Sequence, residues 1–574
     1  MKNIVLEKAK KWTQGSFDNQ TKAAVQQLIN ENSEELNESF YKDLEFGTGG
    51  LRGIMGVGTN RINIYTIGMA TQGLANYLKQ SFEGELSVAI AHDPRINSPL
   101  FARTTAEVFS ANGIHAYLFK ELRPTPELSF AIRHYGCKSG VVITASHNPK
   151  EYNGYKAYWE DGGQLVAPHD KNVIAEVQKI AGPEEVKWEA NEALITIVEE
   201  EIDRAYIDGL KSLCLSPEAV KAQSDMKIVF TALHGTGGTM VPRCLEEIGF
   251  TNVHSVAEQA APDGKFPTVA SPNPEEAAAL DMALKQAEEI GADLVMGCDP
   301  DADRVGIAVR NPEGKLELLN GNMTGALLVN YLITRWSELG KLNGKQFAAK
   351  TIVTTALFEK IANSFNVPCF NVLTGFKYIA ELILKQEGEM EFIGGGEESY
   401  GYLAGDIVRD KDAVLSCILI AEMCAWAKEQ GKSAYDLLID IHLQHGFYLE
   451  DLISIKKEGM SGAEEIAKMM EKLRNNPPAT IADSKIVWLN DYKLQTKKNL
   501  INGNVTQTEL PESNVLQFVT EDETVVTARP SGTEPKIKFY FSVNAKLNDK
   551  AEYESVRNSL KQKIATIQSD LGLT

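Results

Sequence analysis

Three aspartates at alternate positions mark the densest group of chemical residues in the chain. Asp299, Asp301 and Asp303 follow an apolar stretch at 294–296 that is typical of a buried strand, and Arg304 comes next. Three carboxylates so close together repel one another unless a cation lies among them, and hard oxygen ligands suit Mg²⁺ or Ca²⁺. An EF-hand is excluded because Arg304 and Arg310 stand where Gly and Glu are needed. The pattern predicts a metal loop, with a solvated acidic turn as the alternative.

A second candidate group is Ser146 beside His147, where another apolar run (141–143) ends. Loops at the ends of buried strands are where a rigid scaffold presents reactive side chains. The alternative is a polar turn that Asn148-Pro149 closes.

The segment Gly-Gly-Gly-Glu-Glu-Ser at 394–399 combines a flexible backbone with an acceptor, Glu397, and a donor, Ser399. It matches neither a P-loop nor a dinucleotide-binding pattern. Carboxylate, hydroxyl and glycine fit sugar hydroxyls, although a plain Gly-rich turn fits equally well.

Near the C-terminus a cluster of donors indicates an anion site. A guanidinium, two hydroxyls and a flexible backbone lie within five residues: Arg529, Ser531, Gly532 and Thr533. Charge-assisted bonds from Arg and donors from a flexible backbone can surround a phosphate. The alternating stretch 536–541 behind them predicts a strand that would hold this phosphate cradle in place.

The elements that position these loops read as α/β. Helical and strand patterns alternate from about residue 60 onward, with Gly- and Pro-marked turns, and this predicts parallel βαβ units. Residues 1–40 read as amphipathic helix. Past about 455 a charged helix, short strands and a final helix predict an α+β part.

Composition narrows the class of protein. A chain of 574 residues is too long for one core and predicts three to five domains. The net charge of −20 opposes binding to nucleic acid or to acidic membranes. Seven scattered cysteines without a C-x-x-C pair argue for reduced thiols. With no signal-peptide pattern and no membrane span, we expect a cytoplasmic protein.

Taken together, the four loops resemble the α-D-phosphohexomutase family. The matching motifs are T-A-S-H-N-P at 144–149, D-P-D-A-D-R at 299–304, G-E-E-S at 396–399 and R-P-S-G-T-E-P at 529–535. The opening segment and the length look most like the branch of bacterial phosphoglucomutases and animal phosphoglucomutase/phosphopentomutases. The resemblance implies four domains around a central cleft, three mixed α/β and one C-terminal α+β. We expect a helical arm at 1–40 and domains at 41–210, 211–335, 336–455 and 456–574.

The resemblance also implies roles for residues. Ser146 would carry a phosphate and, with the three aspartates, hold Mg²⁺; the expected catalytic groups are Ser146, His147, Lys156, Arg304 and Arg52. The expected substrate-binding residues are Thr374, Gly375, Lys377, Glu397, Ser399, Lys411, Arg529, Ser531, Gly532 and Thr533. One departure concerns Gly401, where several phosphomannomutase-like members carry histidine, so their proton-transfer assignments do not carry over directly.

The implied function is the interconversion of sugar 1-phosphates and 6-phosphates, with glucose favoured, through a phosphoserine and a bisphosphorylated sugar. Glucose 1,6-bisphosphate would be the intermediate and activator. Mannose or pentose phosphates are alternative substrates on the same scaffold. A Mg²⁺-dependent sugar phosphatase and a non-catalytic sugar-phosphate-binding protein are the other readings. The oligomeric state is left open.

Overall fold

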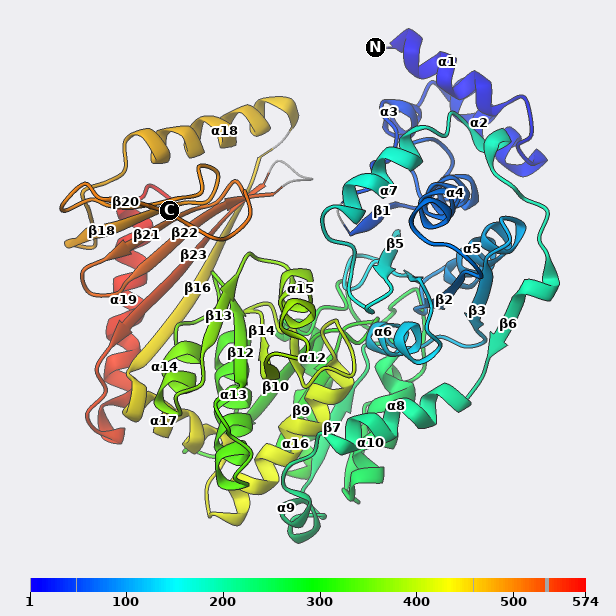
Figure 1. The fold of residues 1–574 in the computed structure, drawn as a ribbon. Coiled ribbons are helices and arrows are strands. Elements are labelled where there is room, and N and C mark those ends of the chain that lie inside the picture. The colour runs from blue at the N-terminus through cyan, green and yellow to red at the C-terminus, as the bar shows by residue number, and fades with distance from the viewer. Residues whose placement is uncertain (1, 48, 458, 532–535, 574) are drawn as a thin grey trace. The chain divides into compact units, whose positions relative to one another are not determined.

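The computed structural model describes residues 2–47, 49–457, 459–531 and 536–573 (Figure 1). The chain folds into two compact units. The first comprises Met1–Asn320, Phe376–Phe392 and Ser399–Gly431, and the second comprises Gly321–Gly375, Ile393–Glu398 and Lys432–Thr574.

The first unit begins with three short helices, α1 (Lys2–Trp12), α2 (Asn19–Glu31) and α3 (Glu34–Phe40). Asp18 and Ser33 cap α2 and α3 by accepting backbone N–H groups. The helices enclose an aromatic core in which Trp12, Phe17 and Phe40 pack with Tyr65. These residues therefore form a folded helical cluster.

A six-stranded sheet follows, in the order β1-β5-β4-β2-β3-β6. Its strands are β1 (Gly50–Ile54), β2 (Ser87–His92), β3 (His115–Phe119), β4 (Ser139–Ile143), β5 (Tyr152–Trp159) and β6 (Ile195–Val198). Four helices lie between its strands in the sequence: α4 (Ile64–Ser81), α5 (Ser98–Ala111), α6 (Thr125–His134) and α7 (His169–Gln178). Side chains alternate between the faces of the sheet. Val141 and Ile143 thus join one apolar core, and Val142 joins another.

A five-stranded sheet in the same unit has the order β11-β10-β9-β7-β8. Its strands are β7 (Ile228–Thr231), β8 (Val253–Ser255), β9 (Leu294–Cys298), β10 (Val305–Arg310) and β11 (Leu316–Leu319). The other helices and the short strand of this unit are α8 (Glu201–Ser212), α9 (Pro217–Ala222), α10 (Gly237–Ile248), α11 (Ala257–Ala260), α12 (Ala277–Ile290), α15 (Phe376–Gln386), α16 (Ala413–Glu429) and β15 (Tyr402–Ala404).

The loop that contains Ser146 and the loop that contains the three aspartates each connect two antiparallel strands. β4 pairs antiparallel with β5, and β9 pairs antiparallel with β10, whereas β2, β3 and β4 are parallel. The alternation of helices and strands predicted parallel units only. The difference has a simple cause, because a connection of a few residues can join neighbouring strands only in an antiparallel pair.

The second unit contains two more sheets. One includes the parallel pair β12 (Gln346–Thr351) and β13 (Cys369–Val372) together with β14 (Glu391–Gly396). Its helices are α13 (Gly321–Glu338), α14 (Leu357–Ser364) and α17 (Ala434–His445). The other sheet has the order β16-β23-β22-β21-β18-β19-β20, with β17 paired to β18.

The strands of that last sheet are β16 (Phe447–Lys456), β17 (Thr480–Ile481), β18 (Ser484–Asp491), β19 (Thr496–Asn499), β20 (Val505–Gln507), β21 (Leu516–Thr520), β22 (Val525–Pro530) and β23 (Lys536–Ala545). It is accompanied by α18 (Gly459–Asn475) and α19 (Tyr553–Asp570). The predicted fold class, mixed α/β domains followed by a C-terminal α+β part, is confirmed. Among the described residues, no helix is long and apolar enough to cross a membrane.

Candidate active site

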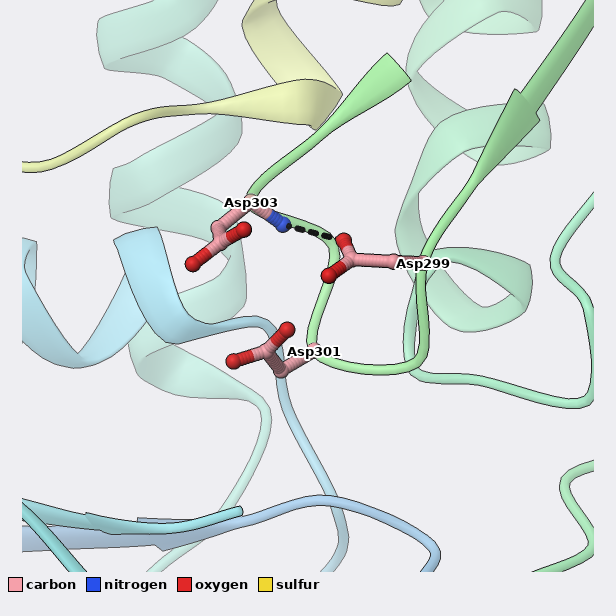
Figure 2. A group of neighbouring side chains, drawn as sticks. All are labelled: Asp299, Asp301 and Asp303. Atoms are coloured by element: carbon pink, nitrogen blue, oxygen red, sulfur yellow. Dashed lines mark hydrogen bonds between the residues drawn. The ribbon is translucent and has the colours of Figure 1, made fainter. Parts of the chain in front are cut away.

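The three aspartates converge at the end of β9 (Figure 2). One carboxylate oxygen from each of Asp299, Asp301 and Asp303 lies within 4.8 Å of the others, and all three side chains are buried. The Oδ1 atom of Asp299 accepts the backbone N–H groups of Asp303, at 3.1 Å, and of Arg304, at 3.0 Å. These bonds fold the loop back so that the carboxylates face one another. Their burial is incompatible with a solvated acidic turn.

The unused oxygens of this loop fit a divalent cation. Asp301 and Asp303 each have a buried Oδ1 without a hydrogen-bond partner in the protein. Their Oδ2 atoms accept hydrogen bonds from the ammonium of Lys156, at 2.6 and 3.0 Å. Buried carboxylate oxygens are expected to be bonded or to coordinate a metal. An all-oxygen set of this kind is the one Mg²⁺ prefers.

Burial and charge shift the pKa values of the loop in opposite directions. Burial and the neighbouring carboxylates of Asp303 and Asp301 raise the pKa of Asp299 well above its ordinary value. Burial would also raise the pKa of Asp303, but Lys156 and Lys411 outweigh it and lower that pKa. Burial would lower the pKa of Lys156, but Asp301 and Asp303 raise it. Lys156 is therefore held in its charged form.

Ser146 lies directly against this loop. It follows β4, is buried, and has a left-handed backbone conformation with φ of 50°. Its hydroxyl donates to Oδ2 of Asp299 at 2.6 Å and lies 3.2 Å from Nδ1 of His147. The serine oxygen therefore shares its surroundings with the metal ligands predicted from the sequence, although 153 positions separate Ser146 from Asp299.

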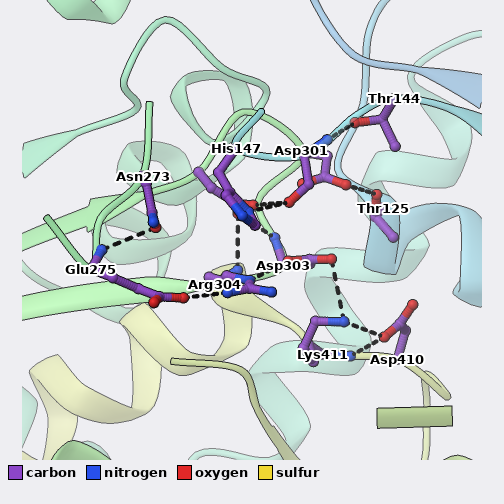
Figure 3. A network of polar contacts seen from close by, with 12 residues as sticks. Thr125, Thr144, His147, Asn273, Glu275, Asp301, Asp303, Arg304, Asp410 and Lys411 are labelled. Carbon is purple, nitrogen blue, oxygen red and sulfur yellow. Dashed lines mark hydrogen bonds and ion pairs between the residues drawn. The ribbon is translucent and has the colours of Figure 1, made fainter. Parts of the chain in front are cut away.

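Cationic groups lie close to the serine and the aspartates, and Figure 3 shows two of them, Arg304 and Lys411, beside Asp303. Arg304 pairs with Glu275, and its Nε lies 3.8 Å from Oδ1 of Asp303. Arg52 donates to the side chain of Asn148, which belongs to the serine loop, at 3.0 Å. Burial, Arg304 and Arg52 lower the pKa of His147 well below its ordinary value. These causes favour the neutral form of the imidazole.

Lys411 also reaches the site. Its ammonium lies 3.3 Å from Oδ2 of Asp303 and 3.0 Å from Oδ1 of Asp410 (Figure 3). A Cβ at Gly401 would lie 2.1 Å from Cδ of Lys411, so the lysine stem fills the space that a side chain at 401 would need. The other predicted lysine, Lys377, pairs instead with Asp170, at 3.7 Å.

Sequence reasoning missed several residues that complete this cluster. Thr125, at the start of α6, donates from its hydroxyl to Oδ2 of Asp301 at 3.1 Å (Figure 3). Asp410, which pairs with Lys411, also accepts a hydrogen bond from the hydroxyl of Tyr158 at 2.7 Å. Tyr158 therefore holds the carboxylate of Asp410 beside Lys411. No local pattern distinguishes these residues, because their partners are remote in sequence.

The remaining predicted residues are divided between the units. In the second unit, Glu397 is buried and accepts the backbone N–H of Gly375 at 3.0 Å, while the hydroxyl of Thr374 is buried without a hydrogen-bond partner. Gly375 has φ of 124°, a conformation that favours glycine. Ser399 belongs to the first unit.

The predicted phosphate cradle lies in the second unit, on the C-terminal sheet. Arg529 is on β22, opposite Lys538 of β23, and the backbone N–H of Ser531 donates to the carbonyl of Lys536 at 2.7 Å. Gly532 and Thr533 lie outside the described residues. Thr527 and Tyr540, on the same strands, line a pocket of about 500 Å³.

Comparison with known proteins identifies the family. Three models of phosphoglucomutase/phosphomannomutase α/β/α domains I, II and III match residues 43–183, 204–314 and 320–442. A phosphoglucomutase of Staphylococcus epidermidis is 39% identical over 519 residues, covering 90% of this chain and 93% of that protein. A phosphoglucomutase of Staphylococcus aureus is 37% identical over 512 residues, covering 89% and 91%.

Solved structures share the fold. A protein described as a putative phosphomannomutase from Thermus thermophilus has a TM-score of 0.67 and 22% identity, covering 91% of this chain and 99% of that one. Parafusin, described as a phosphoglucomutase from Paramecium, also has a TM-score of 0.67, with 17% identity and coverage of 93% and 96%. The chain belongs to the phosphoglucomutase/phosphomannomutase family.

Proposed function

We propose that the protein is a phosphoglucomutase, which interconverts glucose 1-phosphate and glucose 6-phosphate through a phosphoserine at Ser146. The observation that carries the proposal is the contact of the Ser146 hydroxyl with Asp299, at 2.6 Å, beside two further buried aspartates. The relatives of 39% and 37% identity, which carry the name phosphoglucomutase, support the choice of glucose.

The aspartates and the serine oxygen would hold Mg²⁺. A cation held there supplies positive charge to the phosphoryl oxygens during transfer. In the forward half-reaction the bond between phosphorus and Oγ of Ser146 breaks, and a new bond forms to a sugar hydroxyl oxygen. The hydroxyl proton passes to a nearby base, and we assign this role to the imidazole of His147, whose Nδ1 lies 3.2 Å from the oxygen of Ser146. Lys156, Arg304 and Arg52 add positive charge around the transferred group.

We assign the other residues to the substrate. The sugar and its hydroxyls would contact Thr374, Gly375, Lys377, Glu397, Ser399 and Lys411. The phosphate that is not being transferred would bind to Arg529, Ser531, Gly532 and Thr533. A bisphosphorylated glucose would form and return its second phosphate to Ser146, so added glucose 1,6-bisphosphate should activate the enzyme. We propose domains at 41–210, 211–335, 336–455 and 456–574. We also infer a cytoplasmic location, because the cysteines are scattered and odd in number.

The test is a coupled assay in which glucose, mannose and ribose 1-phosphates are supplied at equal concentration with Mg²⁺ and the matching bisphosphate. We expect the highest kcat/KM with glucose 1-phosphate. A higher value with mannose or ribose 1-phosphate would transfer the proposal to that sugar. Release of inorganic phosphate instead of isomer would indicate a phosphatase.

The Ser146→Ala variant tests the phosphoserine. It should lose turnover while retaining the melting temperature of the wild type, and mass spectrometry of the wild type should place one phosphate on the peptide that contains Ser146. Ser555→Ala, on the exposed side of α19, serves as the matched control and should keep full activity. Turnover by Ser146→Ala would contradict the mechanism.

A further inference from the structure

A buried arginine outside the predicted site organises the backbone of the serine loop. Arg95 is 1% exposed and donates only to carbonyl oxygens of that loop from its two terminal nitrogens. Nη2 donates to Ser146 at 2.6 Å and to Asn148 at 2.5 Å, and Nη1 donates to Pro149 at 2.9 Å and to Tyr152 at 3.0 Å. One planar guanidinium thus fixes four carbonyl groups.

Asp93 connects this guanidinium to the backbone N–H of the serine. Its carboxylate lies 3.2 Å from Nε of Arg95, with both side chains fully buried. The same carboxylate accepts the hydroxyl of Thr144 at 2.7 Å, and the hydroxyl oxygen of Thr144 accepts the N–H of Ser146 at 2.8 Å. Ser146 is therefore held from its carbonyl by Arg95 and from its N–H by Thr144.

The backbone of Ser146 requires such support. The left-handed region is unfavourable for residues other than glycine, and Ser146 has φ of 50°. A conformation of this kind persists only where surrounding contacts impose it. The bonds from Arg95 and Thr144 are the contacts that hold the carbonyl and the N–H on either side of the strained φ.

Arg95 also contacts the part of the chain that supplies the aspartates. Its guanidinium lies 5.0 Å from the ring centroid of Phe266, and its backbone forms a bridge with Gly264. A Cβ at Gly264 would lie 2.5 Å from the carbonyl oxygen of Pro94, so only glycine allows this approach. Residues 264 and 266 fall within the segment that matches domain II, as does Asp299.

We propose that Arg95, supported by Asp93, is a positioning residue that sets the oxygen of Ser146 against Asp299. The proposal rests on the proposed phosphoryl transfer at Ser146. The hydrogen bond from Arg95 to Ser146 is to its backbone carbonyl and not to Oγ, so Arg95 acts through the backbone of the loop and through the segment that contains Phe266. Its loss should lower kcat far more than it raises KM, because the residues assigned to the substrate stay in place.

The first variant is Arg95→Lys, which keeps the charge but loses the planar set of donors. We expect kcat to fall roughly 100-fold, the effect of a displacement of about 1 Å in a reacting group, with KM little changed. Thr144→Val, which removes only the bridge between Asp93 and the N–H of Ser146, should lower kcat less, in the same direction and again without a change in KM.

Arg61→Lys is the matched control. Arg61 is also a buried arginine, paired with Glu35 at 2.9 Å and donating to the carbonyls of Glu38 and Asn60, both at 3.1 Å. It lies between β1 and α4 and contacts Glu35 and Glu38 of α3, so its loss should lower the melting temperature while leaving kcat unchanged. If Arg95→Lys lowers only the melting temperature, as Arg61→Lys does, Arg95 is merely structural and the proposal is overturned.

Amide hydrogen exchange separates this inference from the proposed function. In Arg95→Lys, peptides that cover 144–152 should exchange faster, and peptides from α1 to α3 should not. Unchanged exchange at 144–152 would overturn the positioning role even if turnover falls. If the wild type itself has no mutase activity, the proposed function fails, while the exchange measurement still decides whether Arg95 holds the loop.

Discussion

At the scale of residues, the site consists of buried side chains of opposite charge. Asp301 and Asp303 share Lys156, and Asp303 also lies near Lys411 and Arg304. The raised pKa of Asp299 expresses the remaining repulsion together with burial. A bound divalent cation would remove that repulsion, which makes metal binding and protein stability linked quantities.

The Asp301→Asn variant tests this link. It removes one charge and conserves the shape, but it also removes the carboxylate that accepts the buried ammonium of Lys156 at 2.6 Å, so the metal-free variant should be less stable than the metal-free wild type. Mg²⁺ at a hundredfold excess over its Kd should raise the free energy of unfolding of the wild type by about 2.7 kcal/mol, and its melting temperature with it. Mg²⁺ should have little effect on the melting temperature of the variant. Asp281→Asn, on the exposed face of α12, is the control and should respond as the wild type does. An equal response in Asp301→Asn, or activity that survives EDTA, would exclude a metal at this loop.

At the scale of elements, buried carboxylates fix the ends of helices that hold the site. Asp412 caps α16 by accepting the N–H of Leu415 at 2.8 Å, and it also accepts the hydroxyl of Tyr206 at 2.7 Å. Glu422, inside the same helix, accepts the N–H groups of Leu215 and Ser216, at 3.0 and 2.7 Å, just before α9. The N-cap of α16, Asp412, and its interior residue Glu422 are therefore buried acidic residues with defined structural partners.

The Asp412→Asn variant should remove a dependence of stability on pH. Burial raises the pKa of Asp412 from 3.8 to about 6, although its hydrogen bonds act in the opposite direction. The folded state therefore binds more protons than the unfolded state between these values, and the stability of the wild type falls as pH rises through this window. Asn keeps the cap, so the free energy of unfolding of the variant should gain about 2.4 kcal/mol on that of the wild type between pH 4 and pH 7. Urea unfolding at several pH values measures this gain, and parallel profiles for both proteins would refute it.

The Glu422→Leu variant should destabilise the protein. It removes the buried carboxylate that accepts the N–H groups of Leu215 and Ser216, and the loss of these hydrogen bonds lowers the free energy of unfolding. The melting temperature measures the loss. Glu429→Leu, at the exposed end of α16, is the control and should change it little. Equal melting temperatures for the two variants would show that the buried carboxylate contributes nothing to this junction.

At the scale of the whole molecule, the residues assigned to one substrate belong to two compact units. Ser146, the aspartates, Lys411 and Ser399 are in the first unit, whereas Glu397 and Arg529 are in the second. The boundary between the units falls between Glu398 and Ser399, inside the G-E-E-S motif. In the proposed mechanism, phosphoryl transfer is assigned to residues of the first unit, and binding of the phosphate that is not transferred requires Arg529 of the second.

The Arg529→Ala variant tests this requirement. Loss of the guanidinium should weaken substrate binding by about 1.5–3 kcal/mol, the range for a hydrogen bond to a charged group, and so raise KM by roughly 10- to 150-fold. Turnover should depend more strongly on added glucose 1,6-bisphosphate, because the intermediate would escape more often. Lys561→Ala, which removes an exposed charge from α19 in the same unit, is the control. Wild-type kinetics for Arg529→Ala would remove the phosphate cradle from the mechanism.

The sequence by itself determined the strands that precede the serine and aspartate loops and the chemical groups at their ends. The apolar runs before Ser146 and Asp299 predicted β4 and β9, because alternation and burial are local properties of the chain. The density of carboxylates at 299–303 predicted the metal loop for the same reason, since repulsion between near neighbours does not depend on the rest of the fold.

Only the tertiary structure decided which of these groups meet. The contact of Ser146 with Asp299 joins residues 153 positions apart, and that of Lys156 with Asp301 joins residues 145 positions apart. Arg95, Asp93 and Asp410 carry no local signal, because a buried charge is stabilised by partners that only the folded backbone brings near. The antiparallel return of β5 and β10 was likewise absent from the pattern of helices and strands, because pairing direction is a property of two segments together and not of either alone.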